Sequence, residues 1–148
     1  MRVLFVDIDH TLTAAHWRDD LIDVAKRNRD WDAYHSASIN DKPITEMISL
    51  VNCLQISGWY VVGLTTRPEK WRQLTNDWLI KYAVRIDKLL MRPHDDFRPG
   101  ADSKIEQATQ FIAHHQVDSI IVIDDHDAVV SSFRAQNVTV LQAYVSGR

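Results

Sequence analysis

Residues 2–12 read RVLFVDIDHTL, an apolar run that ends in two carboxylates one residue apart. An uninterrupted run of this kind is typical of a strand whose two faces are both buried in a sheet. If the extended geometry continues, the side chains of Asp7 and Asp9 point to the same side of the chain. Two acids so close repel each other, and a cation or a reacting phosphate would justify their arrangement. The stretch therefore predicts a buried parallel strand with an acidic functional site at its carboxyl end.

Similar apolar runs recur along the chain, separated by longer amphipathic stretches. Together with residues 3–7, the expected strands are residues 60–65, 88–91, 119–124 and 138–143. Apolar residues at helical spacing predict helices over residues 44–54, 71–82, 105–115 and 129–133. Pro43 and Pro68 suit the first turns of the first two helices. Strands that alternate with helices predict an α/β fold, a Rossmann-like parallel sheet flanked by helices.

One segment, residues 14–41, interrupts this alternation directly after the first strand. It carries apolar residues among many charges, so we expect a small helical insertion of one or two short helices. The insertion is too short for a domain of its own but long enough to cover a site at the sheet edge. Its tryptophans, Trp17 and Trp31, either hold the insertion together, which we favour, or stack on a base.

Composition narrows the classes of function. A chain of 148 residues, 45% of them hydrophobic, suits one domain spanning residues 1–148. The formal net charge of −3 gives no general attraction to nucleic acid or to anionic membranes. No apolar stretch approaches the roughly 20 residues that cross a bilayer, and no signal-peptide pattern opens the chain. We therefore expect a cytoplasmic protein without membrane contact, and no pattern points to a protein partner.

Sulfur-based chemistry and zinc chemistry are not expected. Cys53 is the only cysteine, so no intrachain disulfide and no thiolate metal site can form. Its apolar neighbours predict that it is a small buried hydrophobic residue. The seven histidines show no HxxxH or HExxH spacing, which makes a zinc site improbable.

Polar side chains gather where the predicted strands end. If the sheet is parallel, these groups meet at one edge, where ligands of open α/β sheets bind. Two acidic pairs, hydroxyl groups and an ammonium form a set suited to phosphoryl transfer. The residues concerned are Asp7, Asp9, Thr65, Thr66, Arg67, Lys104, Asp124 and Asp125.

Phosphoryl transfer assigns each of these groups a role. The expected ligands of a divalent cation, Mg²⁺, are Asp7, Asp9, Asp124 and Asp125. Asp7 would attack phosphorus and form an aspartyl-phosphate. Asp9 would protonate the leaving oxygen and later deprotonate water, for which its acidic neighbours are expected to raise its pKa. Thr65 would donate to a phosphoryl oxygen, with help from Thr66, and Lys104 would balance charge.

Each residue also has a plainer interpretation. The pair Asp124–Asp125 can cap the following helix, a role that is compatible with metal binding. Thr65 and Thr66 can be turn residues, and Lys104 taken alone is typical of a solvated helix lysine. Arg67 and Arg98 lie in loops at the predicted active edge, where a guanidinium grips a phosphate or forms an ion pair.

The order of these motifs resembles the haloacid dehalogenase-like phosphatase superfamily. The match comprises DxDxT, a strand-end Thr, a Lys and paired Asp, at Asp7, Asp9, Thr11, Thr65, Lys104, Asp124 and Asp125. Asp9 points away from the dehalogenase branch, which lacks that acid, and towards phosphate esters. Receiver domains also use a phospho-accepting Asp, a Thr and a Lys, but their acidic pair comes first, so that alternative fails on order.

In detail the chain looks closest to the phosphatase domain of phage polynucleotide kinases and their stand-alone relatives. The features that carry this resemblance are Lys42-Pro43-Ile44, Thr65-Thr66-Arg67, Arg98 six residues before Lys104, and Ile123-Asp124-Asp125. The resemblance implies a Mg²⁺-dependent phosphatase whose substrate is a phosphorylated nucleotide or nucleic-acid end, most closely a polynucleotide 3′-phosphate. It also implies that Thr11, Thr66, Arg67 and Arg98 bind the substrate.

Two departures and two alternatives remain. No GxxxxGK[ST] motif is present, so the kinase half is missing and 5′-phosphorylation is not expected. His10 stands where the family usually has glycine, and the sequence leaves its role open. A phosphatase of free (deoxy)nucleoside monophosphates is the first alternative function. A non-catalytic, phosphate- or metal-binding relative is the second.

Overall fold

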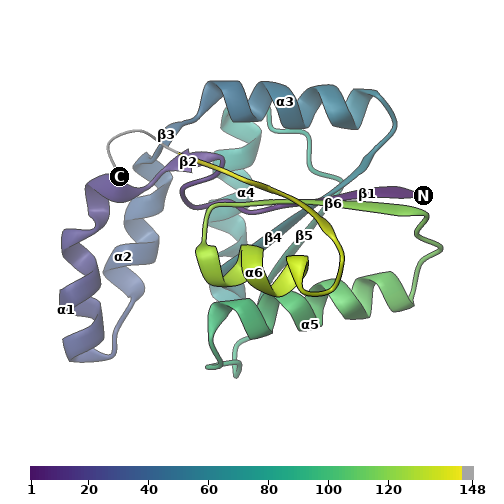
Figure 1. Cartoon of the computed structure of the whole chain (residues 1–148). Helices are drawn as coiled ribbons and strands as arrows, with labels where there is room; N and C mark the ends of the chain where they lie inside the picture. The colour runs from purple at the N-terminus through teal and green to yellow at the C-terminus, as the bar shows by residue number, and fades with distance from the viewer. Residues whose placement is uncertain (145–148) are drawn as a thin grey trace.

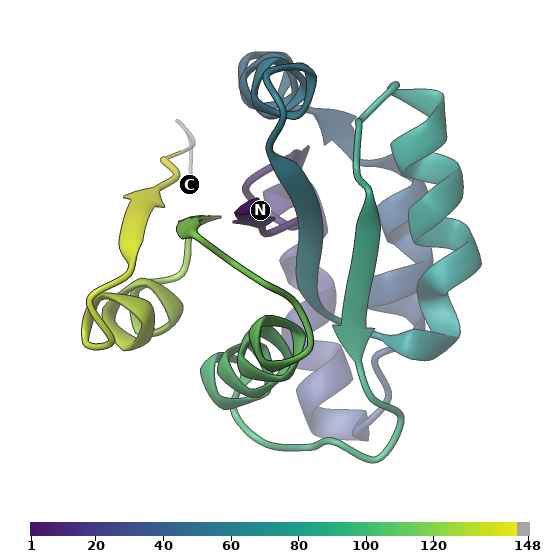
Figure 2. The same ribbon diagram turned by 90° about the vertical axis from the view of Figure 1, so that its right-hand side faces the viewer.

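The centre of the fold is a parallel five-stranded sheet, which Figures 1 and 2 show in a computed structural model that describes residues 1–144. The strand order is β5-β4-β1-β6-β7. The strands are β1 (Arg2–Val6), β4 (Tyr60–Pro68), β5 (Lys88–Arg92), β6 (Ser119–Asp124) and β7 (Thr139–Gln142). All five predicted strands and the α/β class are confirmed. Because β1 is central, its carboxyl end lies between those of β4 and β6.

Helices cover both faces of the sheet, as the uninterrupted apolar strands require. They are α3 (Thr45–Ile56), α4 (Arg72–Lys81), α5 (Gly100–Ala113) and α6 (Asp127–Arg134). Figure 2 shows α3 and α4 on one face of the sheet and α5 and α6 on the other. Alternate residues of β1 serve the two faces: Leu4 and Val6 pack with α3 and α4, whereas Val3 and Phe5 pack with α5 and α6. The whole of β1 is therefore held from both sides, which makes it a rigid support for residues at its end.

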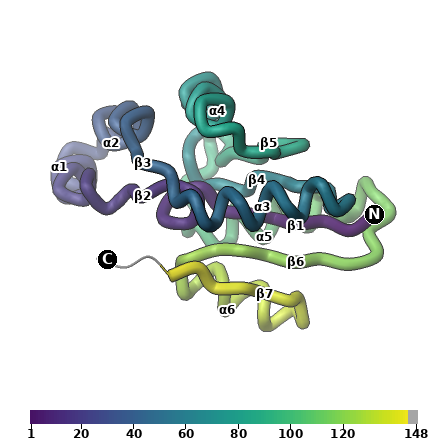
Figure 3. The backbone as a smooth tube through the Cα atoms, turned by 90° about the horizontal axis from the view of Figure 1, so that it is seen from above, coloured from purple at the N-terminus to yellow at the C-terminus, as the bar shows by residue number. Residues whose placement is uncertain are grey.

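The predicted insertion leaves the sheet at the carboxyl end of β1. A two-residue antiparallel pair, β2 (Thr13–Ala14) with β3 (Lys42–Pro43), closes its base. Between these strands lie α1 (Asp20–Asn28) and α2 (Asp32–Ser36), flanked by the 3₁₀ helices His16–Arg18 and Ala37–Asn40. Figures 1 and 3 show α1 and α2 beyond the end of the sheet that carries the carboxyl terminus of β1. The expected small helical insertion is confirmed.

Three local expectations are wrong. Pro43 pairs with Thr13 in β3, and α3 begins two residues later. Pro68 is the last residue of β4, in register with Arg92 of β5 after an irregularity in the pairing, and it precedes the 3₁₀ helix Glu69–Trp71. Cys53 is exposed, since the buried face of α3 is formed by other apolar residues of the helix.

Within residues 1–144, none of the helices has the length and apolar character that crossing a membrane requires.

Candidate active site

A tight loop follows β1 and directs the side chains of the DxDxT motif. The carbonyl oxygen of Ile8 accepts hydrogen bonds from the amides of Thr11, Leu12 and Thr13 at 3.2, 2.9 and 3.1 Å. His10 has a φ of 63°, in the left-handed region that favours glycine. The resemblance places glycine at this position, and the backbone geometry supplies the reason. His10 adopts the same conformation at an energetic cost, and its side chain lines the pocket described below.

Three carboxylates meet where β1 and β6 end side by side, and we call them the acidic cluster. One oxygen from each of Asp7, Asp124 and Asp125 lies within 4.8 Å of the others, and all three residues are buried. The parallel pairing of Val6 with Ile123 brings the first two together. The sequence placed these groups at one edge, and the structure shows them within ligand distance of one another.

Lys104 is the cation that joins this cluster. Its Nζ donates to Oδ1 of Asp7 and to Oδ2 of Asp124, both at 2.6 Å. Burial lowers its pKa, but the two carboxylates outweigh burial and hold the pKa above its usual range. Lys104 therefore stays charged. Burial and the nearby Asp7 in turn raise the pKa of Asp124, although Lys104 opposes them.

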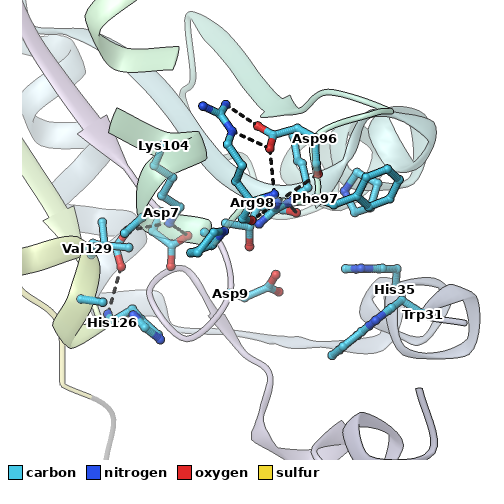
Figure 4. Close-up of a pocket in the computed structure, with 18 of the residues that line it drawn as sticks. Asp7, Asp9, Trp31, His35, Asp96, Phe97, Arg98, Lys104, His126 and Val129 are labelled. Atoms are coloured by element: carbon cyan, nitrogen blue, oxygen red, sulfur yellow. Dashed lines mark hydrogen bonds and ion pairs between the residues drawn. The ribbon is translucent and has the colours of Figure 1, made fainter. Parts of the chain in front are cut away.

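The backbone of α5 brings Lys104 to this position. A Cβ atom at Gly100, the first residue of α5, would lie 2.9 Å from Cγ2 of Thr66. A larger residue at position 100 would therefore require the Thr66 side chain to move, and glycine lets the helix start this close to the end of β4 without that shift. One turn later Lys104 extends to the acidic cluster (Figure 4). The second oxygen of Asp7 accepts a hydrogen bond from Thr11 at 3.1 Å, so both oxygens have a donor.

The acidic cluster fits a hard divalent cation. Three buried carboxylates face one ammonium, so negative charge is in excess in a place where water screens it poorly. Carboxylate oxygens are the ligands that Mg²⁺ prefers, and one or two of them normally suffice with substrate phosphate and water. Asp7, Asp124 and Asp125 are thus the residues that can hold the ion.

Asp9 belongs to a different group of charges, which we call the arginine network. Its Oδ1 accepts from Nη2 of Arg18 at 2.5 Å and from Nη2 of Arg67 at 2.7 Å, and its Oδ2 accepts from Nε of Arg67 at 3.1 Å. Arg18 also forms a bidentate pair with the buried Asp41 at 2.9 and 2.8 Å. Two carboxylates and two guanidiniums therefore neutralise each other beside the acidic cluster.

This arrangement corrects the expectation for the protonation of Asp9. Burial raises its pKa, but the guanidiniums of Arg67 and Arg18 outweigh burial and hold the pKa well below its usual range. The expected rise in pKa from acidic neighbours is wrong, because arginines surround the carboxylate. Among residues 1–144, the carboxylates close enough to share a metal ion do not include that of Asp9.

The structure also places the other predicted substrate ligands. Arg67 is buried and donates hydrogen bonds to Asp9 and, at 3.1 Å, to Thr75. Its guanidinium was expected to face the pocket, and instead it faces these two side chains. The guanidinium of Arg98 is held by Asp96 and Glu106. The hydroxyl of Thr65 is buried and accepts a hydrogen bond from the backbone amide of Arg67 at 3.1 Å.

A pocket of about 630 Å³ opens over the acidic cluster. Asp7, Lys104, Asp124 and Asp125 lie at its floor, and Thr66 and Arg98 are also among its lining residues. Side chains of the insertion and of the loop after β5 form its outer walls (Figure 4). The insertion thus forms a wall of the pocket, as its position in the sequence suggested.

Several residues of this region escaped the sequence analysis. Arg18 and Asp41 carried no motif, because their pairing depends on a fold that brings residues 23 positions apart together. Phe97 is a single aromatic residue in a polar loop, and this isolation could have marked it as a candidate binding residue. Tyr34 and His35 stood in a segment without a clear period. These residues are Arg18, Tyr34, His35, Asp41 and Phe97.

The sheet, the acidic edge, the lysine from α5 and the insertion after β1 together define the haloacid dehalogenase-like class of phosphatases. The chain belongs within it to the polynucleotide kinase PNKP phosphatase domain family, whose match covers residues 1–146. It is accordingly a phosphoric monoester hydrolase of the haloacid dehalogenase type. Both resemblances seen in the sequence are confirmed at this level.

Solved structures show the same fold. A chain from the Pnkp1/Rnl/Hen1 RNA repair complex is 24% identical with a TM-score of 0.79, and the match covers 95% of this chain and 42% of that one. A second chain from this complex is 23% identical with a TM-score of 0.81, covering 99% and 46%. A haloacid dehalogenase-like family protein, SP0104 from Streptococcus pneumoniae, is 17% identical with a TM-score of 0.67, covering 96% and 84%.

The present chain therefore spans less than half the length of the two repair-complex chains. Comparison with curated proteins gives no match.

Proposed function

We propose that this protein is a Mg²⁺-dependent phosphatase that removes a 3′-phosphate from the end of a nucleic acid. The observation that carries the proposal is the setting of Asp7, which lies at the floor of the pocket between Lys104 and Thr11. Membership of the PNKP phosphatase family supports a nucleic-acid end as the substrate.

Asp7 acts as the nucleophile in this mechanism. One carboxylate oxygen attacks phosphorus in line, the bond from phosphorus to the ester oxygen breaks, and an aspartyl-phosphate forms on Asp7. Water then attacks phosphorus, releases inorganic phosphate and restores the carboxylate. Lys104 neutralises charge between nucleophile and phosphate, and Thr66, which lines the pocket, would donate to a phosphoryl oxygen. Mg²⁺ bound by Asp7, Asp124 and Asp125 would lower the repulsion between a carboxylate and a dianion.

The protonation of Asp9 differs from the one that the sequence suggested, and this bears on its proposed role. As an ionised carboxylate it can accept the proton of the attacking water, but only weakly, because the ion pairs that lower its pKa also lower its basicity. Its predicted first task, protonation of the leaving oxygen, requires that Arg18 and Arg67 release the carboxylate, because their ion pairs hold it ionised. The sequence of acid and base steps on Asp9 therefore stays a prediction.

Phosphate release from a substrate panel tests the proposal. The panel comprises one oligonucleotide with a 3′-phosphate, the same oligonucleotide with a 5′-phosphate, and 3′- and 5′-mononucleotides, each with Mg²⁺ and with a chelator. We expect the highest kcat/KM for the 3′-phosphorylated oligonucleotide and no release after chelation. A higher value for mononucleotides would replace the proposed substrate with free nucleotides. The absence of release from every substrate and with every divalent metal would favour a non-catalytic relative.

A further inference from the structure

The pocket is larger than the phosphate group and the metal ion that would bind beside Asp7 require. Its volume of about 630 Å³ lies within the ~300–1,000 Å³ of sites that enclose whole small molecules. The charged residues at the floor account for a phosphate and a metal ion, while the outer part is lined by aromatic side chains. Trp31, Tyr34 and His35 come from the insertion, and Phe97 comes from the loop after β5. These aromatic residues have no task in the hydrolysis itself.

Phe97 is the most exposed of them, and its loop is well tied. Its side chain is 90% exposed, although burial of a phenylalanine is favourable by roughly 1.5–3 kcal/mol. The guanidinium of Arg92 donates to the carbonyl oxygens of Asp96 and Arg98, at 3.1 and 2.7 Å. Asp96 accepts the amide of Arg98 at 3.1 Å and pairs with its side chain. The residues on both sides of Phe97 are thus fixed, which places the backbone of Phe97, and with it the exposed side chain, beside the pocket.

The opposite wall is a supported aromatic layer. Trp31 packs edge-on against Tyr34 at a ring-centroid distance of 5.5 Å, and Tyr34 packs against His35 at 5.3 Å. Arg18 lies over the Tyr34 ring at 4.3 Å and joins this layer to the arginine network. Burial, together with Arg67 and Arg18 and against Asp9, lowers the pKa of His35 to about 4, so its ring is neutral at pH 7. Figure 4 shows Phe97 on one side of the opening and Trp31 and His35 on the other.

We propose that Phe97 and the wall formed by Trp31 and His35 are a nucleobase-binding site, which holds the base of the nucleotide whose phosphate reaches Asp7. Flat aromatic faces bind any base by stacking, because every base has a π-face. A neutral imidazole and two apolar rings suit a base better than a second phosphate. This inference rests on the proposed function, since it assumes a nucleotide substrate at the same site.

The two tryptophans of the insertion have different tasks under this proposal. Trp17 donates its indole N–H to Asp41 at 2.8 Å and is not among the residues that line the pocket, so it holds the insertion together. Trp31 lines the pocket and remains 37% exposed there. Of the two roles left open by the sequence, the structure supports the first for Trp17 and the second for Trp31.

Two oligonucleotides test the site, one ending in a normal 3′-phosphorylated nucleotide and the other in a 3′-phosphorylated abasic residue. We expect Phe97→Ala to lower kcat/KM for the first about 5- to 50-fold and to leave the second unchanged. Phe97→Trp should retain the preference for the base, and Trp31→Leu should lose part of it. Tyr144→Ala is the matched control, since Tyr144 is 87% exposed and is not among the residues that line the pocket.

Affinity of both oligonucleotides for the Asp7→Asn protein is measured in parallel, so that the base contact is detected without turnover. The nucleobase site would be overturned, and the phosphatase left intact, by two results together. These are equal affinity of the Asp7→Asn protein for the two oligonucleotides and equal kcat/KM of the otherwise wild-type enzyme for them. Base-dependent binding that Phe97→Ala removes, without phosphate release from either oligonucleotide, would support the site and overturn the proposed activity.

Discussion

Two groups of buried charge lie next to each other at the carboxyl end of β1 and differ in balance. The acidic cluster has three carboxylates and one ammonium, whereas the arginine network has two carboxylates and two guanidiniums. The two begin only two residues apart, at Asp7 and Asp9. Counted as formal charges, the acidic cluster carries a net negative charge and the arginine network is neutral.

This difference separates chemistry from scaffolding. An excess of buried negative charge is costly unless a cation binds, so the acidic cluster is prepared for a ligand. A balanced network needs no ligand, and it ties the insertion, through Arg18 and Asp41, to the sheet edge, through Asp9 and Arg67. We therefore expect changes in the first group to act on turnover and metal binding, and changes in the second to act on stability.

The largest expected effect concerns the nucleophile. Asp7→Asn should lower kcat for phosphate release by at least ~10³-fold, because an amide cannot form the aspartyl-phosphate. The circular-dichroism spectrum should be unchanged. Asp77→Asn, on the exposed face of α4, is the matched control and should keep full activity. An Asp7→Asn protein with wild-type turnover would refute the mechanism.

The next effect concerns the stability of the arginine network. Arg18→Met should lower the free energy of unfolding by about 3–5 kcal/mol, because it removes the bidentate partner of the buried Asp41 and one of the two guanidiniums that bind Asp9. Denaturant titration measures this change, and Arg27→Met on the exposed side of α1 should stay within about 0.5 kcal/mol of wild type.

A double variant sharpens this prediction. Arg18→Met combined with Asp41→Asn leaves Arg67 and Asp9 as a neutral pair. We expect the double variant to be more stable than the sum of the single changes by about 1–3 kcal/mol. Strict additivity would show that the two residues are not coupled and that the network does not act as a unit.

A smaller effect distinguishes the two groups directly through Mg²⁺. At about 100 times its Kd, Mg²⁺ should stabilise the wild-type protein by roughly 2.7 kcal/mol. Arg18→Met should retain this increment, and Asp124→Asn should lose most of it, since only the second change removes a proposed metal ligand. Thermal unfolding with and without Mg²⁺ measures both. An equal loss of the increment in both variants would contradict the separation of the groups.

The smallest effect is a dependence on pH at the pocket wall. Because burial lowers the pKa of His35 from 6.5 to about 4, the unfolded chain binds a proton between these values and the folded protein does not. Stability should therefore fall as pH falls from 6.5 to about 4, with a His35 contribution of about 1–3 kcal/mol. His35→Phe should flatten this part of the stability curve, and His114→Phe, at an exposed position, should not. Identical curves for wild type and His35→Phe would exclude a depressed pKa.

The parts of the fold and site that could be predicted depend on short-range pattern. The apolar run before Asp7 identified a buried strand, and the order of Lys104 and Asp124 along the chain located the site, because parallel strands end at one edge. The boundaries of the insertion emerged from the break in that pattern. The position of Cys53 was missed because the interior face of α3 depends on which side packs against the sheet.

The ion-pair partner of each charged side chain could not be predicted from the sequence pattern. The acids nearest to Asp9 in the sequence were expected to raise its pKa, but Arg67, 58 residues away, is the main cause of its lowered pKa. Arg67 itself was expected to face the substrate and instead faces a carboxylate. Phe97 and Trp31 face one pocket only because the loop after β5 and the insertion extend past the same sheet edge.

The sequence by itself thus determined the sheet, the position of its active edge, and the residues Asp7, Lys104, Asp124 and Asp125 that gather there. These follow from strand periodicity and chain order, which are local properties. Only the tertiary structure decided that Asp7 and Asp9, two residues apart, belong to different groups of charge. Ion pairing and desolvation depend on distances between atoms remote in the chain, and folding alone sets those distances.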